Sequence, residues 1–527
     1  MKKTTLFVVL LLASVLAWGQ TLQVSGLQTG IWNADTVLVT DDVTVVDSVV
    51  VTAGTVVLFD GFYGITVSNG AIFEAQGTEN DSVRFTVADT TGLSVYNTGE
   101  GGWNGFFLEK AGRVRFRYCV LEYAKASDTT DMLGGALKIN MCDDIVISHS
   151  SLRFNRAREQ GGALSAENSH VVMTDCSVND NMVFTTDNIF YRYGGALRFL
   201  KCDVELLSMA FLRNIGDACV GGALSLDSCS VMLDRAVFSD NVGVNGAGLY
   251  LMRSNHKVCW LSNLLFEHNL SRHFGGGLAF SDVSPNVYNI LVTNNDSEGV
   301  ACSGIFFYQD CSPKLNNCIV YGNYPGSTAG NPDTVQMWLW TFDGYAPAFR
   351  NCLIEGGTKY IRGAELLEVF DDIIDADPLF VDAEQRDYHL SENSPCRDAG
   401  NPNVPSTLAD GLDLDGNERV MNQRIDIGPY EYQGTVAVSH QLAGPSHARL
   451  VGNPLNARSW VEFDHEIQGE VTVTVCSMNG RRVVQKAYSL ENATRLAIGD
   501  LVSPLTPGVY LIEMACGKET FVIKAVR

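Results

Sequence analysis

Four side chains that could carry out acid/base chemistry recur at nearly constant spacing. They are Asp180, Arg213, Asp240 and His268, separated by 33, 27 and 28 residues. Proton transfer by a carboxylate and a basic side chain is the chemistry of enzymes that cleave polysaccharides. The alternative is a ladder of opposite charges that compensate one another on a solvated face. We favour the ladder, because structural ion-pair networks often mimic active sites.

A second group has the residue types of a metal site. Asp413, Asp415 and Asn417 suggest a calcium loop, but the glycine between them comes earlier than in an EF-hand. A turn held by aspartate side chains is the simpler interpretation. The chain contains no G-x-S-x-G, H-E-x-x-H, C-x-x-C or phosphate-loop motif. We therefore expect no cofactor, with calcium as the open alternative.

A repeated Gly-Gly-Ala-Leu motif sets the elements that must position these side chains. It stands at residues 134–137, 161–164, 194–197 and 221–224, and in altered form at 246–249, 275–278 and 302–305. A period of about 27 residues over seven copies indicates a solenoid. Alternating apolar residues after each copy indicate strands, and paired glycines would break a helix.

A column of asparagines has the same period as the glycine motif. It consists of Asn155, Asn181, Asn214, Asn241, Asn269, Asn295 and Asn323. An apolar residue stands three positions before each of them. Each side-chain amide could bond the next at a turn that needs the left-handed conformation. We therefore predict an asparagine ladder in a parallel β-helix whose coils stack about 4.8 Å apart.

These columns predict an all-β fold: a right-handed parallel β-helix solenoid followed by a small C-terminal antiparallel β-sandwich domain. The chain resembles right-handed parallel β-helix proteins of the pectin-lyase-like class. Its Gly-Gly-Ala-Leu and Phe-x-x-Asn pairing is also similar to repeats of polymorphic outer-membrane proteins and bacterial surface adhesins. The first resemblance implies a scaffold that often carries polysaccharide lyases and hydrolases, which need clustered carboxylates. The outward column after the motif has none: it reads Lys138, Ser165, Arg198, Ser225, Tyr250, Ala279 and Phe306.

Two interruptions of the repeat are rich in aromatic residues. They span residues 184–193 and 324–347, and we expect both to form loops on one side of the solenoid. Loops on a rigid scaffold are where binding residues concentrate. The candidate ligand-binding side chains are Tyr191, Tyr193, Tyr324, Trp338, Trp340 and Tyr345.

The ends of the chain carry export signals. Residues 1–19 have the two lysines, the apolar run and the small-x-small pattern of a signal peptide cleaved between Gly19 and Gln20. Residues 448–527 resemble the C-terminal sorting domain of type IX secretion cargo in Bacteroidota. This resemblance implies passage across both membranes and a place at the cell surface or outside the cell. We expect no transmembrane segment in the mature chain.

The segment that precedes the sorting domain also resembles a known family. Blocks such as Asp377-Pro378-Leu379-Phe380 and Asp426-Ile427-Gly428-Pro429-Tyr430 resemble the choice-of-anchor Q domain, which follows β-helices in secreted bacterial proteins. We interpret it as a C-terminal cap of the solenoid. The predicted parts are a signal peptide (1–19), an N-terminal cap with first coils (20–115), regular coils (116–375), the Q-like cap (376–433), a linker (434–447) and the sorting domain (448–527).

Composition limits the partners. The formal net charge of −23 argues against nucleic acid as a partner. Of the 14 cysteines, Cys142, Cys202 and Cys229 share one repeat position, and Cys176 and Cys318 another, with serine and alanine, which favours buried thiols over disulfides. The favoured function is a non-catalytic adhesin or glycan- or matrix-binding protein. The alternative is a polysaccharide lyase or glycoside hydrolase, which would need a carboxylate and a Lys or Arg within about 6 Å of each other.

Overall fold

The computed structural model describes residues 20–95, 97–127, 132–184, 192–298, 302–323, 336–342, 344–404, 411–421, 424–433, 448–451, 459–477, 482–501, 505, 509–516 and 519–526. The chain divides into two compact units, Met1–Gly434 and Thr435–Arg527. Strands dominate both units, so the predicted all-β class is confirmed. The predicted signal peptide, including Gly19, lies outside the described residues, which begin at Gln20.

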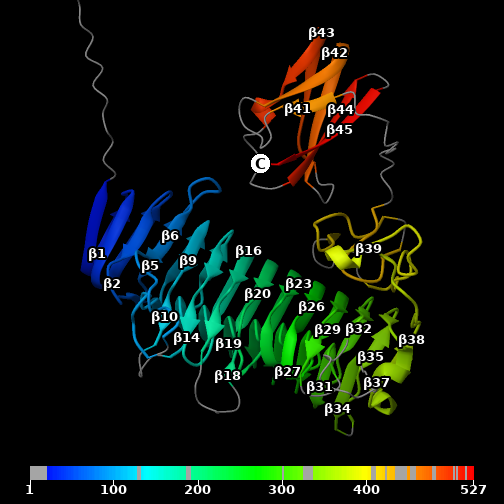
Figure 1. Ribbon diagram of the computed structural model, residues 1–527. Helices are drawn as coiled ribbons and strands as arrows, with labels where there is room; N and C mark the ends of the chain where they lie inside the picture. Colours follow the sequence, from blue (N-terminus) through cyan, green and yellow to red (C-terminus); the bar gives the residue numbers. More distant parts are fainter. Residues whose placement is uncertain are drawn as a thin grey trace, which may run out of the picture. The chain divides into compact units, whose positions relative to one another are not determined.

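The first unit is a parallel β-helix in which each coil contributes strands to three faces (Figure 1). The first face follows the glycine motif and consists of β4 (Ile65–Ser68), β7 (Phe106–Glu109), β11 (Leu137–Asn140), β15 (Leu164–Glu167), β19 (Leu197–Leu200), β22 (Leu224–Asp227), β25 (Leu249–Met252), β28 (Leu278–Ser281), β31 (Ile305–Gln309), β34 (Met337–Thr341) and β37 (Ile361–Arg362). Consecutive strands of this face pair in parallel and in register.

The other two faces share five long strands that bend at a corner. These are β16 (His170–Asn179), β20 (Asp203–Leu212), β23 (Ser230–Ser239), β26 (Cys259–Glu267) and β29 (Asn286–Thr293). The second face adds β5 (Ile72–Gln76), β8 (Arg113–Arg117), β12 (Ile145–Ser148), β32 (Lys314–Asn316), β35 (Ala348–Arg350) and β38 (Val369–Asp371). The third face adds β3 (Val56–Phe59), β6 (Val83–Val87), β9 (Cys119–Glu122), β13 (Ser151–Arg153), β33 (Ile319–Tyr321) and β36 (Leu353–Ile354).

Short strands of two to five residues lead from the third face back to the first. They are β10 (Lys125–Ala126), β14 (Arg156–Ala157), β17 (Met182–Val183), β18 (Arg192–Tyr193), β21 (Cys219–Val220), β24 (Val242–Asn245), β27 (Leu270–Phe274) and β30 (Asp296–Ser297). These segments pair in parallel with their counterparts in neighbouring coils. The coil is therefore hydrogen-bonded along most of its circumference.

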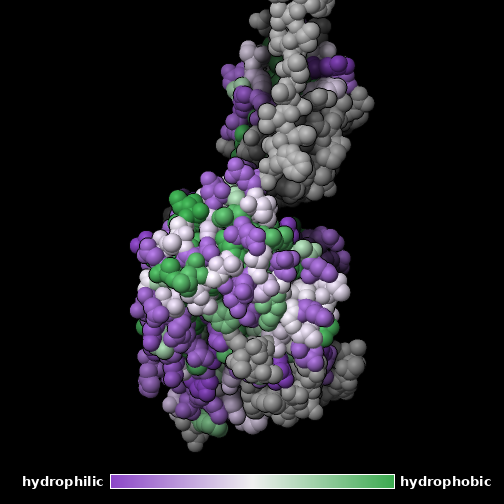
Figure 2. Space-filling model, turned by 90° about the vertical axis from the view of Figure 1, so that its left-hand side faces the viewer, coloured by the Kyte–Doolittle hydropathy of each residue, from purple (hydrophilic) through white to green (hydrophobic). Residues whose placement is uncertain are grey.

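The solenoid begins with two long strands, β1 (Thr21–Trp32) and β2 (Thr36–Thr52), which pair in parallel. Trp32 is buried and lies edge-on to Phe73 in the core. Leu27, Ile31 and other apolar residues of these strands are exposed. Figure 2 faces this end and shows apolar patches on a largely polar surface.

The two glycines of the motif have different tasks. The first glycine has a positive φ, for example 63° at Gly134 and 65° at Gly194, which side chains disfavour. The second glycine lies against the next coil. A Cβ on Gly195 would stand 2.0 Å from the carbonyl oxygen of Gly222, so no other residue fits without displacing the backbone. The motif is thus a corner at which successive coils approach closely.

The seven asparagines form one continuous stack inside the solenoid. All are buried, and each Nδ2 donates to the Oδ1 of the asparagine in the next coil at 2.9–3.1 Å. The same Oδ1 accepts the backbone N–H of the preceding asparagine. Gln336 continues the stack after Asn323 at 2.8 Å. The left-handed conformation falls one residue before each asparagine, as at Asp180 and Asp240 (φ 56° at both).

Like residues also stack in the apolar core. The rings of Phe211, Phe238 and Phe266 lie nearly parallel, with centroids 4.6 and 4.7 Å apart. Twelve described cysteines are buried free thiols. In one of their columns the backbone N–H of Cys202 donates to the Sγ of Cys229 at 3.4 Å. Burial raises the pKa of the Cys302 thiol to about 12, which keeps it protonated and unreactive.

The end of the solenoid is closed by its own last coil. Residues from Ala364 to Ile373, including the 3-10 turn η2 (Ala364–Leu366), pack against the core there. The segment 376–433, which we expected to cap this end, lies instead along the third face. It contains β39 (Phe380–Asp382), the 3-10 turn η3 (Ala383–Gln385) and β40 (Asp387–Leu390) (Figure 1). Its apolar side chains cover large aliphatic residues of that face, which explains why it settles on the side.

The second unit is an antiparallel sheet with its own apolar core. Its strands are β41 (Ala448–Val451), β42 (Trp460–Ser477), β43 (Arg482–Ala497), β44 (Val509–Cys516) and β45 (Glu519–Val526). β42 pairs with β41, β43 and β44, and β44 pairs with β45. Alternate residues of β42, such as Val471, Val473 and Val475, are buried in the core. The predicted linker 434–447 lies outside the described residues.

Candidate functional site

The four side chains of the predicted acid/base strip occupy one turn position in successive coils of the third face. All four residues have positive φ, between 51° and 56°. Arg213 donates two hydrogen bonds to the carboxylate of Asp180, at 2.9 and 2.8 Å. Asp240 and His268 do not extend this pair; they bind partners that the sequence did not indicate. The strip is therefore divided into two separate clusters.

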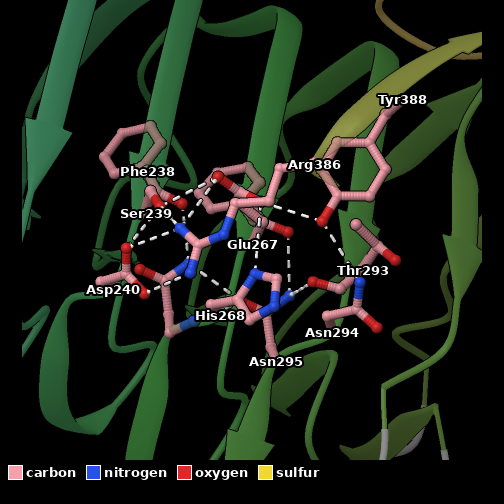
Figure 3. Close-up of polar contacts among 12 residues, drawn as sticks. Phe238, Ser239, Asp240, Glu267, His268, Thr293, Asn294, Asn295, Arg386 and Tyr388 are labelled. Carbon is pink, nitrogen blue, oxygen red and sulfur yellow. Dashed lines mark hydrogen bonds and ion pairs between the residues drawn. The ribbon is translucent and has the colours of Figure 1, made fainter. Parts of the chain in front are cut away.

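The second cluster joins the segment 376–433 to the third face (Figure 3). Arg386 donates to both carboxylate oxygens of Asp240, at 2.7 and 3.0 Å, and to the hydroxyl of Ser239 at 3.1 Å. Tyr388 donates its hydroxyl to Glu267 at 2.9 Å. We call Asp240, Glu267, Arg386 and Tyr388 the latch, because they connect parts of the chain more than 100 residues apart.

The local backbone conformation of the segment directs the side chains of Arg386 and Tyr388 toward the solenoid. The side chain of Asp382 accepts the backbone N–H of Gln385 and so begins η3. Arg386 then has a left-handed φ of 62°, and β40 follows directly. Alternation along β40 buries Tyr388 and Leu390 against the third face. Sequence analysis did not single out Arg386. The Asp-Tyr-His-Leu alternation of β40 was the available signal for Tyr388.

The latch keeps both of its carboxylates ionised. Burial favours the neutral form of Glu267, but hydrogen bonds from His268, Tyr388 and Ser239 outweigh it and hold its pKa below the ordinary value. Hydrogen bonds from Arg386 likewise lower the pKa of Asp240. A general acid at neutral pH needs a raised pKa. The cluster brings carboxylates and an arginine together, but its electrostatics are those of a structural contact.

The aromatic candidates gather on the first face. In the outward column after the glycine motif, Tyr250, Ala279, Phe306 and Trp338 are neighbours in register. Together with Tyr193, Val220, Met252, Phe274, Cys302, Tyr308 and Trp340 they form what we call the aromatic face. Two segments that interrupt the repeat far apart in sequence thus contribute to one cluster, in which Tyr250 and Phe306 are buried and Trp340 is exposed.

Trp338 and Trp340 lie on a strand, which corrects our prediction that they belong to a loop. β34 pairs with β31 and places both indoles outward on the same face. The two rings are nearly parallel, with centroids 5.4 Å apart. The guanidinium carbon of Arg362 lies 4.0 Å from the centroid of the Trp338 ring. Trp340 is 47% exposed and Tyr345 is 36% exposed. Phe342, 52% exposed, extends the surface and was missed. The candidates Tyr191 and Tyr324 lie outside the described residues.

The predicted calcium ligands form a turn. Asp413 is buried, and its carboxylate accepts the backbone N–H groups of Asp415, Asn417 and Glu431 at 2.8–3.0 Å. Asp415 lies 2.6 Å from Nε2 of His389. Among the residues that the structure describes, no group of three or more His, Cys, Asp or Glu side chains is placed to hold a metal ion. The aspartate-held turn accounts for these contacts, and calcium binding stays a prediction.

Comparison with known proteins identifies the C-terminal unit. Residues 452–526 match the family described as the secretion system C-terminal sorting domain. This match supports export by the type IX secretion system to the cell surface or the extracellular space. No curated protein matches the chain. Within the described residues, we find no helix with the length and hydropathy of a membrane span.

The latch can be tested by removing its cation. Arg386→Gln takes both ion-pair hydrogen bonds away from Asp240 and leaves that carboxylate with the hydrogen bond from the Ser239 hydroxyl. We expect a local destabilisation of about 1 kcal/mol, modest because the pair is partly exposed. Hydrogen exchange of peptides that cover residues 380–396 should become faster. Arg213→Gln breaks the neighbouring pair with Asp180 and is the matched control. Equal exchange in both variants would contradict the role of the latch.

The segment 376–433 should also weaken as the pH rises. Burial raises the pKa of Glu431 to about 8. Burial opposes protonation of His389, but Asp415 and Asp387 outweigh it and raise its pKa to about 9. A pKa that is higher in the folded state contributes stability at low pH, which is lost as the pH passes the folded value. We expect the melting temperature of the first unit to fall between pH 6 and pH 8.5.

The variant Glu431→Gln separates the contribution of Glu431 to the pH dependence of the melting temperature from those of other titrating groups. The variant should flatten the decline between pH 6 and pH 8.5, because a side-chain amide at this position cannot ionise. It should also lower the melting temperature at every pH, since one of the backbone N–H groups of Met421 and Asp426 loses its acceptor. Glu392→Gln, at an exposed position of the same segment, should reproduce the wild-type pH dependence. A wild-type slope in Glu431→Gln would refute the assignment.

Proposed function

We propose that this protein is a type IX secretion cargo that acts outside the cell as a non-catalytic, glycan- or matrix-binding adhesin. The sorting-domain match supports its export. The observation that carries the binding function is the exposed edge of the aromatic face, where Trp340, 47% exposed, stacks on Trp338 beside the buried rings of the cluster. Trp340, Phe342 and Tyr345 are exposed aromatic side chains of one segment, and exposed apolar groups that gather on a surface are candidates for contact with a partner.

The aromatic face has the chemistry of a carbohydrate platform. Indole and phenol rings offer flat apolar surfaces on which the C–H faces of sugar rings can pack, and Trp and Tyr are enriched at binding hot spots. Polar groups surround the rings and can bond sugar hydroxyls. Arg362 lies over Trp338, and Arg253 is paired with Asp227 beside the cluster. A few polar groups around an apolar surface fix the orientation of a ligand.

The charged residues favour binding over catalysis. The latch meets the distance criterion for the polysaccharide-cleaving alternative, since Arg386 lies 3.6 Å from Glu267. However, Glu267 is buried by the segment that carries Arg386 and Tyr388, and its oxygens already accept hydrogen bonds. No pair of carboxylates in this cluster has pKa values that diverge toward an acid and a base. This is why we prefer an adhesin to a lyase or hydrolase.

Export should depend on the sorting domain. Deletion of residues 452–526 should leave the protein in the periplasm, because the secretion machinery would have no signal to recognise. Cell fractionation and surface protease accessibility measure this directly. A full-length Trp340→Ala protein, in which the sorting domain is intact, should reach the surface in wild-type amounts. Unchanged surface display of the truncated protein would disprove the sorting function.

Binding should depend on the exposed indole. Trp340→Ala removes an exposed ring of the aromatic face without touching the core, and we expect roughly tenfold weaker retention on the glycan or matrix ligand. A glycan and extracellular-matrix array, followed by affinity measurement on the best ligand, provides the readout. Trp260→Ala is the control, because Trp260 stacks on Tyr288 on a different face. Equal loss in both variants would rule out a specific platform.

A further inference from the structure

The outward side chains of the third face change in size halfway along the solenoid. Its outward column runs through Val120, Ser151, Ser177, Ala210 and Val237, and then through Leu265, Leu291, Ile319 and Leu353. The large aliphatic residues of the second half are covered by Tyr388, Leu390, Cys396 and Ile427 of the segment 376–433. The first half carries smaller side chains, and of its five residues only Val237 packs against that cluster among the described residues.

The uncovered half is a groove of about 650 Å³, within the range of ligand sites. Its floor is the small half of the column. One wall is the turn between the second and third faces, where Tyr118, His149, Asp175, Ser208 and Arg235 all have positive φ. The groove ends against Leu414, Asp415 and Tyr430 of the segment. From Val120 to Val237 it crosses four coil spacings, about 19 Å.

The backbone of the groove is unavailable to a ligand. Its strands pair with the coils on both sides, so their N–H and C=O groups are already bonded. An extended peptide could not add itself as a strand, since strand addition requires a free edge. Recognition must therefore come from side chains that project from the floor and the wall.

Those side chains suit a polyhydroxylated chain. The hydroxyls of Ser151 and Ser177 stand on neighbouring coils in the floor, and neither has a hydrogen-bond partner among the described residues. His149, 3.6 Å from Asp175, adds an imidazole and a carboxylate to the wall. Hydroxyls, carboxylates and imidazoles can each donate to or accept from sugar hydroxyls. Their repetition from coil to coil matches a ligand that is itself a repeat.

We propose that this groove binds an extended polysaccharide chain, laid across the coils, with one end of the chain against Asp415 and Tyr430. The site is on a different face from the aromatic platform and does not depend on it. The segment 376–433 then has a second task besides covering apolar residues: it closes one end of the groove. A long chain enters from the open end near Thr78 and Glu79.

The test fills the groove without disturbing the core. Ala210→Trp places an indole on the floor, and Glu205→Trp, on the second face of the same strand β20, is the matched control. The full-length protein is passed over immobilised dextran, xylan, polygalacturonate and hyaluronan, with gelatin as a polypeptide. We expect retention on at least one polysaccharide, at least tenfold loss in Ala210→Trp and wild-type retention in Glu205→Trp. Ser177→Phe provides a second filling variant.

The outcomes separate this site from the aromatic platform. Retention that survives Trp340→Ala but is lost in Ala210→Trp supports the groove alone. Retention lost only in Trp340→Ala overturns the groove and leaves the platform. Retention on gelatin alone, or on none of the immobilised polymers, overturns the assignment of a carbohydrate ligand. Melting curves that match the wild type establish that the filling variants are folded.

Discussion

The asparagine stack and the register that it imposes are the constraint on which the first unit depends. Each buried amide uses its donor and its acceptor on neighbouring coils, so a coil that shifted by one residue would leave several buried polar groups unpaired. The left-handed residue before each asparagine turns the chain at that point. Because every coil turns at the same place, residues with the same repeat position form straight columns on the surface. The two proposed binding surfaces of this molecule are therefore built from columns.

The columns were predictable, since a repeat shows directly which residues align. The glycine corners, the asparagine stack and the stacked phenylalanines all follow from residues 25 to 33 positions apart. The contacts of the segment 376–433 were not predictable in the same way. Arg386 and Asp240 are 146 residues apart and belong to no common repeat, so no period relates them. The side position of the segment depends on the large aliphatic residues Leu265, Leu291 and Ile319, and only the fold makes evident that they point outward from the solenoid.

The positions of Trp338 and Trp340 show a second limit of prediction from the sequence. Residues 324–347 interrupt the repeat, and an interruption predicts a loop. Yet Met337–Thr341 alternates buried and outward side chains and takes its place as β34. The segment forms a strand because Met337 and Leu339 fill the inward positions of the coil in the apolar core. Trp338 and Trp340 are consequently fixed by a strand instead of being carried on a loop. A rigid platform loses less conformational entropy on binding than a loop does.

A solenoid arranges chemistry differently from a globular enzyme. A catalytic site needs unlike groups that converge on one point, with environments that separate their pKa values. In this chain the charged groups that converge are paired, as Asp180 is with Arg213 and Asp240 is with Arg386. What remains available to a ligand is the exposed ring of Trp340 on the first face and the column of hydroxyls on the third. Distributed contacts of modest strength gain affinity when a polymer engages several at once, because each engaged site raises the effective concentration at the next. This is the physical reason why we propose binding to a repetitive extracellular polymer rather than catalysis.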